Sequence, residues 1–278
     1  MRNRALKDMI WAACIAIALG AVFIGFVLEA VGHYYGDKAR PVMDLGHNIS
    51  APATVPPQSG MTADGTVHRL QQSGDAGQVY LDSLVYLCDA SFIPLRSSGM
   101  TAGQVWGSES GSLPMNGLDL WTITFPADNS QRSPGQACML SQPKTLVLCI
   151  GSEGLDGLTE DSFVQYYEEL FEDIHSYSPN TVMICCPVAS VTPGYVGLDG
   201  MSGTRAAEIN SWIERVCSES GAWYADLTTV LNDGGYLRPE FAEADGRTLN
   251  AAGLNAVLNY LRIHALSANW RRVYGIRG

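Results

Sequence analysis

Short apolar runs and amphipathic segments alternate along the second part of the chain. Residues 84–87 are apolar and end in a small, polar turn at Asp89, and residues 145–150, 181–186 and 222–226 show a similar pattern. An uninterrupted apolar run of this length is typical of a strand that is buried on both faces of a parallel sheet. The pattern therefore predicts four strands of one parallel sheet.

Three longer segments repeat their apolar residues at the spacing of one helix face. They predict helices over residues 158–177, 202–220 and 250–268, with Thr159 at the N-cap position of the first and Gly221 ending the second. Strands that alternate with helices indicate an α/β fold. We expect a flavodoxin-like three-layer α/β/α sandwich with a parallel sheet.

The start of the chain carries a different signal. Residues 9–28 form an uncharged apolar run, about the 20 residues that a helix needs to cross a membrane. Three basic residues precede this run, a bias that places residues 1–8 in the cytoplasm and the rest of the chain outside. The expectation is a transmembrane signal anchor in the plasma membrane, single-pass, with an extracytoplasmic C-terminal domain. A cleaved signal peptide is the alternative.

Residues 29–78 separate this run from the first predicted strand. They are rich in Pro, Gly, Ser, Thr and Gln and show little hydrophobic periodicity, which predicts a flexible linker. The alternative is an irregular loop that docks on the domain through Met43, Leu45 and His47. Residues 79–278 then form the α/β domain.

Charge and cysteine content exclude several kinds of partner. The chain has a formal net charge of −11 and only three lysines, so we exclude nucleic acid, whose phosphates are bound by clustered Lys and Arg. Cys149, Cys185 and Cys186 fall in predicted buried strands, where cysteine acts as a small hydrophobe. A disulfide remains the alternative if the domain lies outside the cytoplasm. No Cys-x-x-Cys and no His-rich cluster is present, so we expect no metal site and no cofactor.

Small and polar residues follow the predicted strands directly. The carboxyl ends of parallel strands meet at one edge of a sheet, and open α/β folds bind their ligands there. Ser91 and Gly99, which stand in small-residue turns, are further candidates for this pocket. The residues expected to line one shallow, acidic crevice are Cys88, Asp89, Ala90, Gly151, Ser152, Glu153, Asp245 and Thr248.

Residues 243–253 read Glu-Ala-Asp-Gly-Arg-Thr-Leu-Asn-Ala-Ala-Gly. They resemble the last signature block of the SGNH (GDSL-type) hydrolases, in which Asp-Gly-x-His-Leu-Asn-x-x-Gly precedes the final helix. Residues 87–90 fall where that family has its Gly-Asp-Ser nucleophile turn, and residues 150–153 fall where it has Gly-x-Asn. The resemblance covers about residues 80–266. It implies the family's α/β fold and an ester-hydrolysing Ser-His-Asp triad, with a glycine amide and an asparagine holding the oxyanion.

The chain differs from the family's motifs at the positions that the resemblance assigns to catalysis. It keeps the acid position, Asp245, and it keeps Asp89 of the nucleophile turn. Alanine has no nucleophilic atom, threonine cannot act as a base near neutral pH, and a carboxylate repels an oxyanion. The substituted positions are Ala90 for the nucleophile, Thr248 for the histidine, Glu153 for the oxyanion asparagine and Cys88 for the first glycine.

These departures predict a hydrolase fold without hydrolase activity. The expected role is binding of a cell-surface glycan or an envelope protein, through the old pocket or the surface around it. The alternative is an active esterase or deacetylase that uses an unmatched residue such as Ser91 or Cys88. Because Asp245 has lost its imidazole partner, we expect it to bond to Thr248 or to backbone amides.

Overall fold

The computed structural model describes residues 66–197 and 199–266, without the side chain of Asp119. The predicted anchor, residues 9–28, and residues 29–65 of the predicted linker lie outside the described residues. Within the two described ranges, no helix has the length and hydropathy of a membrane span.

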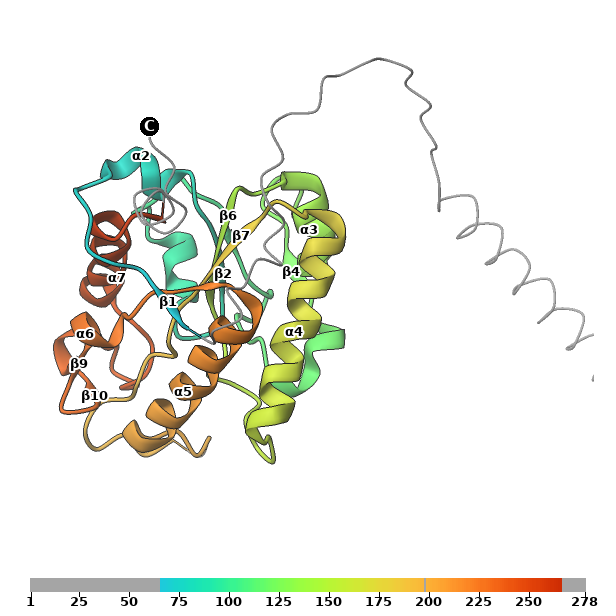
Figure 1. Ribbon diagram of the computed structural model, residues 1–278. Coiled ribbons are helices and arrows are strands. Elements are labelled where there is room, and N and C mark those ends of the chain that lie inside the picture. The colour runs from blue at the N-terminus through green and yellow to red at the C-terminus, as the bar shows by residue number, and fades with distance from the viewer. Residues whose placement is uncertain (1–65, 198, 267–278) are drawn as a thin grey trace, which may run out of the picture. The chain divides into compact units, whose positions relative to one another are not determined.

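A six-stranded parallel sheet forms the middle layer of the domain (Figure 1). Its order is β1-β8-β7-β6-β2-β3. Without β1, this is the flavodoxin-like order 2-1-3-4-5 of doubly wound folds. The four predicted strands are confirmed as β2, β6, β7 and β8. The strands are β1 His68–Arg69, β2 Val85–Cys88, β3 Val105–Trp106, β6 Thr145–Cys149, β7 Val182–Cys185 and β8 Trp223–Tyr224.

Helices cover both faces of this sheet, which confirms the three-layer α/β/α arrangement (Figure 1). One face packs on α3 Pro134–Ser141, α4 Glu160–Tyr177 and α5 Gly203–Ser220. The other face packs on α2 Gly77–Asp82, α6 Thr228–Leu231, α7 Ala251–Ile263 and the 3-10 helix η1 Ile93–Ser97. Alternation along each strand sends neighbouring side chains to opposite cores, as Leu87 and Cys88 of β2 show.

The predicted helix ends depend on local chemistry. Thr159 Oγ1 accepts a hydrogen bond from the backbone N–H of Ser162, which caps α4. Gly221 ends α5 at φ 74°, in the left-handed region that favours glycine. Helix α7 ends at Ile263, short of residue 268, because the next amides bond elsewhere: Ala265 N–H donates to Ser73 Oγ and Leu266 N–H to Tyr80 OH.

Short elements connect these layers at the ends of the sheet. Two antiparallel hairpins pair β4 Ile123–Thr124 with β5 Gln131–Arg132, and β9 Asn232–Asp233 with β10 Tyr236–Leu237. Two further 3-10 helices are η2 Met115–Leu120 and η3 Pro239–Phe241.

The domain begins earlier than the sequence indicates. Strand β1 pairs with β8, Leu70 N–H donates to Tyr224 O at 2.8 Å, and Leu70 is buried in the core. The assignment of residues 66–78 to the flexible linker is therefore wrong. A two-residue strand is too short to show hydrophobic alternation, so only its pairing identifies it.

All six described cysteines are buried free thiols. Cys88 and Cys149 lie opposite each other in the register of β2 and β6. Neither they nor the other described cysteines form a disulfide, so these side chains act as small core residues.

Candidate functional site

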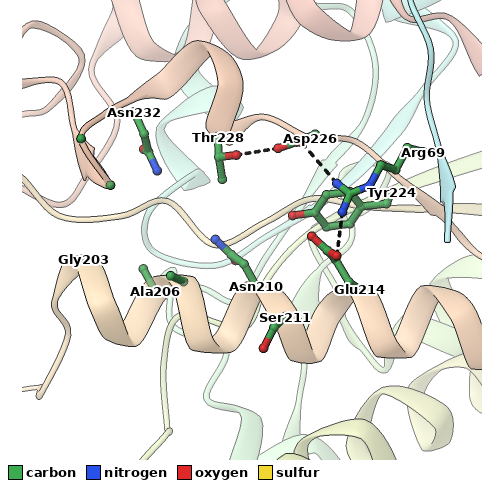
Figure 2. A pocket seen from close by; sticks show the side chains of 13 residues that line it. Arg69, Gly203, Ala206, Asn210, Ser211, Glu214, Tyr224, Asp226, Thr228 and Asn232 are labelled. Atoms are coloured by element: carbon green, nitrogen blue, oxygen red, sulfur yellow. Dashed lines mark hydrogen bonds and ion pairs between the residues drawn. The ribbon is translucent and has the colours of Figure 1, made fainter.

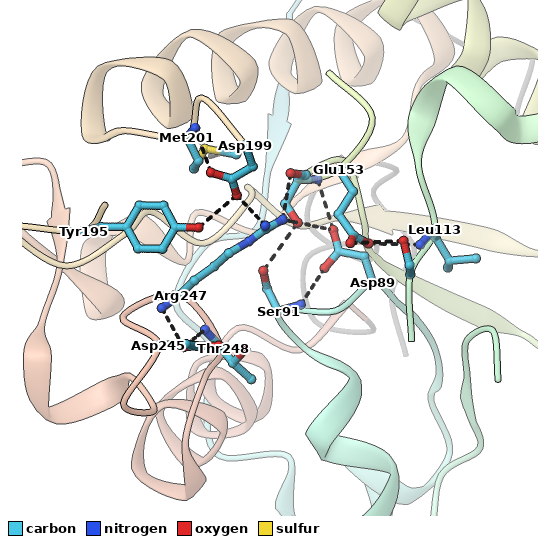
Figure 3. Close-up of polar contacts among 12 residues, drawn as sticks. Asp89, Ser91, Leu113, Glu153, Tyr195, Asp199, Met201, Asp245, Arg247 and Thr248 are labelled. Carbon is cyan, nitrogen blue, oxygen red and sulfur yellow. Dashed lines mark hydrogen bonds and ion pairs between the residues drawn. The ribbon is translucent and has the colours of Figure 1, made fainter. Parts of the chain in front are cut away.

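The carboxylate of Asp89 is the centre of a buried polar cluster at the carboxyl ends of β2 and β6 (Figure 3). Its Oδ2 accepts from the backbone N–H of Ser152 at 3.0 Å and from Ser152 Oγ at 2.7 Å. Its Oδ1 accepts from the backbone N–H of Ser91 at 3.1 Å. One carboxylate therefore fixes the turns that follow two neighbouring strands.

The two serines of this cluster also contact each other. Ser91 Oγ lies 3.3 Å from Ser152 Oγ, and both side chains are buried. The carbonyl of Ser91 accepts from the backbone N–H of Leu249 at 3.0 Å. Positions 90 and 248, the predicted nucleophile and histidine positions, are therefore each one residue away from a direct backbone contact between their turns.

Arg247 lies across the cluster. Its Nη2 donates to Ser152 O at 2.9 Å and to Ser152 Oγ at 3.1 Å, and its Nη1 forms an ion pair with Asp199. Tyr195 OH also donates to Asp199, at 3.0 Å. Figure 3 shows the long Arg247 side chain crossing from the Asp245 turn toward Asp199. We call Asp89, Ser91, Ser152, Arg247 and Asp199 the Asp89 cluster.

Asp245 makes the predicted substitute contacts. Its Oδ2 accepts from Thr248 Oγ1 at 2.6 Å, and its Oδ1 accepts from the backbone N–H groups of Arg247 and Thr248, both at 2.9 Å. Partial burial raises the pKa of Asp245, but the hydrogen bonds from Thr248 and Arg247 together outweigh it and lower the pKa. The expected Asp245–Thr248 bond is confirmed, and it holds the acid toward position 248.

The carboxylate of Glu153 accepts hydrogen bonds from a neighbouring loop. Its Oε1 accepts from Ser112 Oγ at 3.1 Å, and its Oε2 accepts from the backbone N–H of Leu113 at 2.9 Å. Its own carbonyl accepts from Met115 N–H at 2.9 Å. The carboxylate at the predicted oxyanion position therefore holds the loop before η2.

Gly151 occupies a position that only glycine fills without strain. Its φ is +113°, and an added Cβ would lie 3.3 Å from Phe163 Cζ. A side chain here would both strain the backbone and press on a buried ring. Ala90 is half-buried between Asp89 and Ser91. Gly151 is buried and comes directly before Ser152 of the Asp89 cluster.

Two predicted site residues lie elsewhere. Cys88 is fully buried in the core between the sheet and α7, because strand alternation turns it away from the face that Asp89 takes. Gly99 belongs to the exposed loop that precedes β3, where Gln78 Nε2 donates to the adjacent Met100 O at 3.0 Å. Helix η1 returns the chain to the amino ends of the strands, so Gly99 is not part of the site. Both assignments are wrong.

Arg247 is a residue of the Asp89 cluster that the sequence interpretation missed. A signal was available, since Arg247 stands between two predicted site residues and adds a cation to an otherwise acidic set. Asp199 and Tyr195, in contrast, lie in an irregular loop between β7 and α5 that shows no periodicity. Within residues 66–197 and 199–266, no group of three His, Cys, Asp or Glu side chains could hold a metal ion.

The burial of Asp89 predicts a pH-dependent stability. Desolvation raises the pKa of Asp89 from 3.8 to about 6, although hydrogen bonds from Ser152 oppose the shift. The folded protein thus binds the proton of the Asp89 carboxyl more tightly than the unfolded chain does. The contribution of this proton to the unfolding free energy is complete below about pH 4 and is lost as the pH rises through about 6.

The variant Asp89→Asn carries no such proton. Relative to it, we expect the unfolding free energy of the unaltered protein to fall by about 3 kcal/mol between about pH 4 and pH 7. Urea titrations of both proteins at several pH values measure this difference. A difference that stays constant over the range would contradict the prediction.

The family comparison agrees with this geometry. A model of the GDSL-like lipase/acylhydrolase family matches residues 110–256, more than half of the chain. The match begins after the turn at Asp89. The assignment of that turn to the site is therefore supported by its contacts with Ser152 and Leu249. No curated protein sequence matches the chain.

Several solved structures are similar to the chain at low identity. A GDSL-like lipase from Bacteroides thetaiotaomicron is 10% identical, with 71% of this chain and 92% of that chain covered and a TM-score of 0.46. A carbohydrate esterase family 3 protein from Talaromyces cellulolyticus is 9% identical, with 70% and 99% covered and a TM-score of 0.42. A peptidoglycan O-acetylesterase is 13% identical, with 51% and 41% covered and a TM-score of 0.40. The family match is the stronger finding, and by it the chain belongs to the GDSL-like lipase/acylhydrolase family.

Proposed function

We propose that this protein is a catalytically inactive member of its family that binds a glycan or a protein of the cell envelope. In this proposal residues 9–28 anchor it in the plasma membrane as a single-pass protein, and the α/β domain lies on the outer side. The apolar run at residues 9–28 and the basic residues before it support the anchor and its orientation.

The observation that carries the proposed inactivity is Ala90. It stands in the turn after β2, next to the backbone contact between Ser91 and Leu249, where the family resemblance implies the nucleophile. Loss of the nucleophile from a Ser-His-Asp system costs on the order of a millionfold in turnover. The side chain at position 248 is a hydroxyl that donates to Asp245, so it supplies no base.

Arg247 adds a second reason. Its guanidinium bonds both the carbonyl and the hydroxyl of Ser152, at the end of β6. Its side chain is 17% exposed, so most of it fills space at the carboxyl ends of the strands. A substrate ester approaching Ser91 or Ser152 would have to displace this side chain and break its ion pair with Asp199.

The contacts of Ser91 and Cys88 count against an active esterase. Ser91 is 1% exposed and its Oγ pairs with Ser152 Oγ, whereas an activated serine needs a base as its partner. The three described histidines are engaged elsewhere: His68 belongs to β1, His175 Nε2 contacts Thr181 O, and His264 stacks on Tyr260. Burial raises the pKa of the Cys88 thiol well above its usual range, which disfavours the thiolate.

The deciding experiment measures hydrolysis of short-chain aryl esters and of acetylated glycans by the full-length protein. We expect no turnover above the rate in buffer, and the same result for the Ser91→Ala variant. An active family esterase assayed in parallel shows that the substrates and conditions are suitable. Turnover that Ser91→Ala or Cys88→Ala abolishes would establish the esterase alternative instead.

A further inference from the structure

A polar pocket lies at the β1–β8 edge of the domain (Figure 2). Its volume is about 610 Å³, and none of its lining residues belongs to the Asp89 cluster. Pockets that bind small molecules in proteins have volumes of about 300–1,000 Å³. This pocket is therefore large enough for a ligand, and its chemistry indicates which one.

One wall of the pocket is a face of α5 that includes several small residues. Gly203, Ala207 and Ser211 recur along it at helical spacing. At one end the turn between β9 and β10 closes the space, since a Cβ added to Gly203 would lie 3.0 Å from Gly235 O. Towards the other end, Arg69 crosses the gap to α5 and forms an ion pair with Glu214 at 2.6 Å. The groove along α5 is therefore bounded at both ends.

The opposite wall offers polar groups with spare hydrogen-bonding capacity. The hydroxyl of Tyr224 and the side-chain amide of Asn232 make no hydrogen bond to any described residue, and Figure 2 shows both directed into the pocket. The Asp226 carboxylate accepts once at each oxygen, from Thr228 Oγ1 at 2.5 Å and from Arg69 at 3.2 Å. Each carboxylate oxygen can accept further bonds.

The charge of the pocket restricts the chemical class of ligand that it can bind. Arg69 pairs with both Glu214 and Asp226, which leaves a formal charge of −1 among the three groups. A phosphate or carboxylate ligand would be repelled by this excess carboxylate. An apolar ligand would leave the amide and hydroxyl groups without partners, which is costly once water is displaced.

We propose that this pocket binds a neutral or amine-bearing saccharide unit. A sugar hydroxyl both donates and accepts, so adjacent hydroxyls can pair with the Asn232 amide and the Asp226 carboxylate. The inference rests on the binding role proposed above and deepens it, because it names a ligand class and a site apart from the Asp89 cluster.

The test titrates the full-length protein with N-acetylglucosamine, its β-1,4-linked disaccharide, glucosamine and glucuronate, followed by calorimetry and ligand-observed NMR. Ala207 is exposed on the α5 wall, so Ala207→Trp fills the pocket without entering the core. Ala252→Trp is the matched control, since Ala252 is exposed on α7 and does not line the pocket. Asn232→Ala removes an amide that supports no other described residue.

We expect saturable binding of the neutral and amine-bearing saccharides and binding of glucuronate that is weaker by about tenfold. Ala207→Trp should abolish binding and Ala252→Trp should preserve it, while Asn232→Ala should weaken it by about threefold to tenfold with an unchanged melting temperature. If Ala207→Trp does not fold, the Asn232→Ala result decides.

Two outcomes would overturn the inference, and they differ in meaning. Saccharide binding that survives both Ala207→Trp and Asn232→Ala would remove the pocket assignment and leave the proposed glycan-binding role intact. No saturable binding of any of the saccharides by the unaltered protein would remove the pocket assignment and the glycan-binding role together. Neither outcome alters the proposed absence of hydrolysis, which the ester assay tests separately.

Discussion

Changing Ala90 to Ser and Thr248 to His together is expected to create esterase activity on the order of a hundredfold above that of the unaltered chain, since a positioned general base contributes about 10²–10⁴-fold. The acid is already in place, because Asp245 accepts a hydrogen bond from the present side chain at position 248. The contact between Ser91 and Leu249 holds the two altered positions close to each other. Initial rates on an aryl acetate measure the gain.

The single variants are the controls for this experiment. Ala90→Ser alone has no base and Thr248→His alone has no nucleophile, so both should stay at the rate of the unaltered protein. Adding Glu153→Asn should raise the rate of the double variant, although it gives up the bonds to Ser112 and Leu113. A double variant that folds normally and is no faster than the single variants would contradict the assigned positions.

Removing the ring of Phe163 is expected to lower the unfolding free energy by about 3–5 kcal/mol, the usual cost of a buried Phe→Ala change. Phe163 is 0% exposed on α4, and its ring centroid lies 5.2 Å from that of Tyr167 and 5.4 Å from that of Trp212. It also packs beneath the turn at Gly151. The substitution therefore leaves a cavity under the Asp89 cluster, and chemical denaturation measures its cost.

Tyr177→Ala is the matched control, because Tyr177 is an aromatic residue of the same helix that is 43% exposed. Its contact with Gln142 is made through the backbone carbonyl, which the substitution retains. We expect a change within about 0.5 kcal/mol, as for most surface substitutions. Equal losses of unfolding free energy for the two variants would contradict the expected cost of a cavity at Phe163.

Features that depend on nearby residues could be predicted from the amino-acid pattern. The four buried strands and three long helices follow from the spacing of apolar residues, and the ends of α4 and α5 follow from Thr159 and Gly221. The bond between Asp245 and Thr248 belongs to the same class, since its partners lie three positions apart in one turn. Such contacts form within a few residues, so local pattern and chemistry predict them.

The set of side chains that share the site depends on contacts between distant segments. Arg247 meets Ser152, 95 positions away in the chain, and its ion pair with Asp199 depends on where an irregular loop returns. The two-residue strand β1 exists only through its pairing with β8. Cys88 and its neighbour Leu87 face opposite cores. The packing of the sheet selects the direction of each side chain, and a strand that is buried on both faces has no local pattern that indicates this direction. Contacts between distant segments depend on strand order and on the packing of each face, and these are properties of the whole fold.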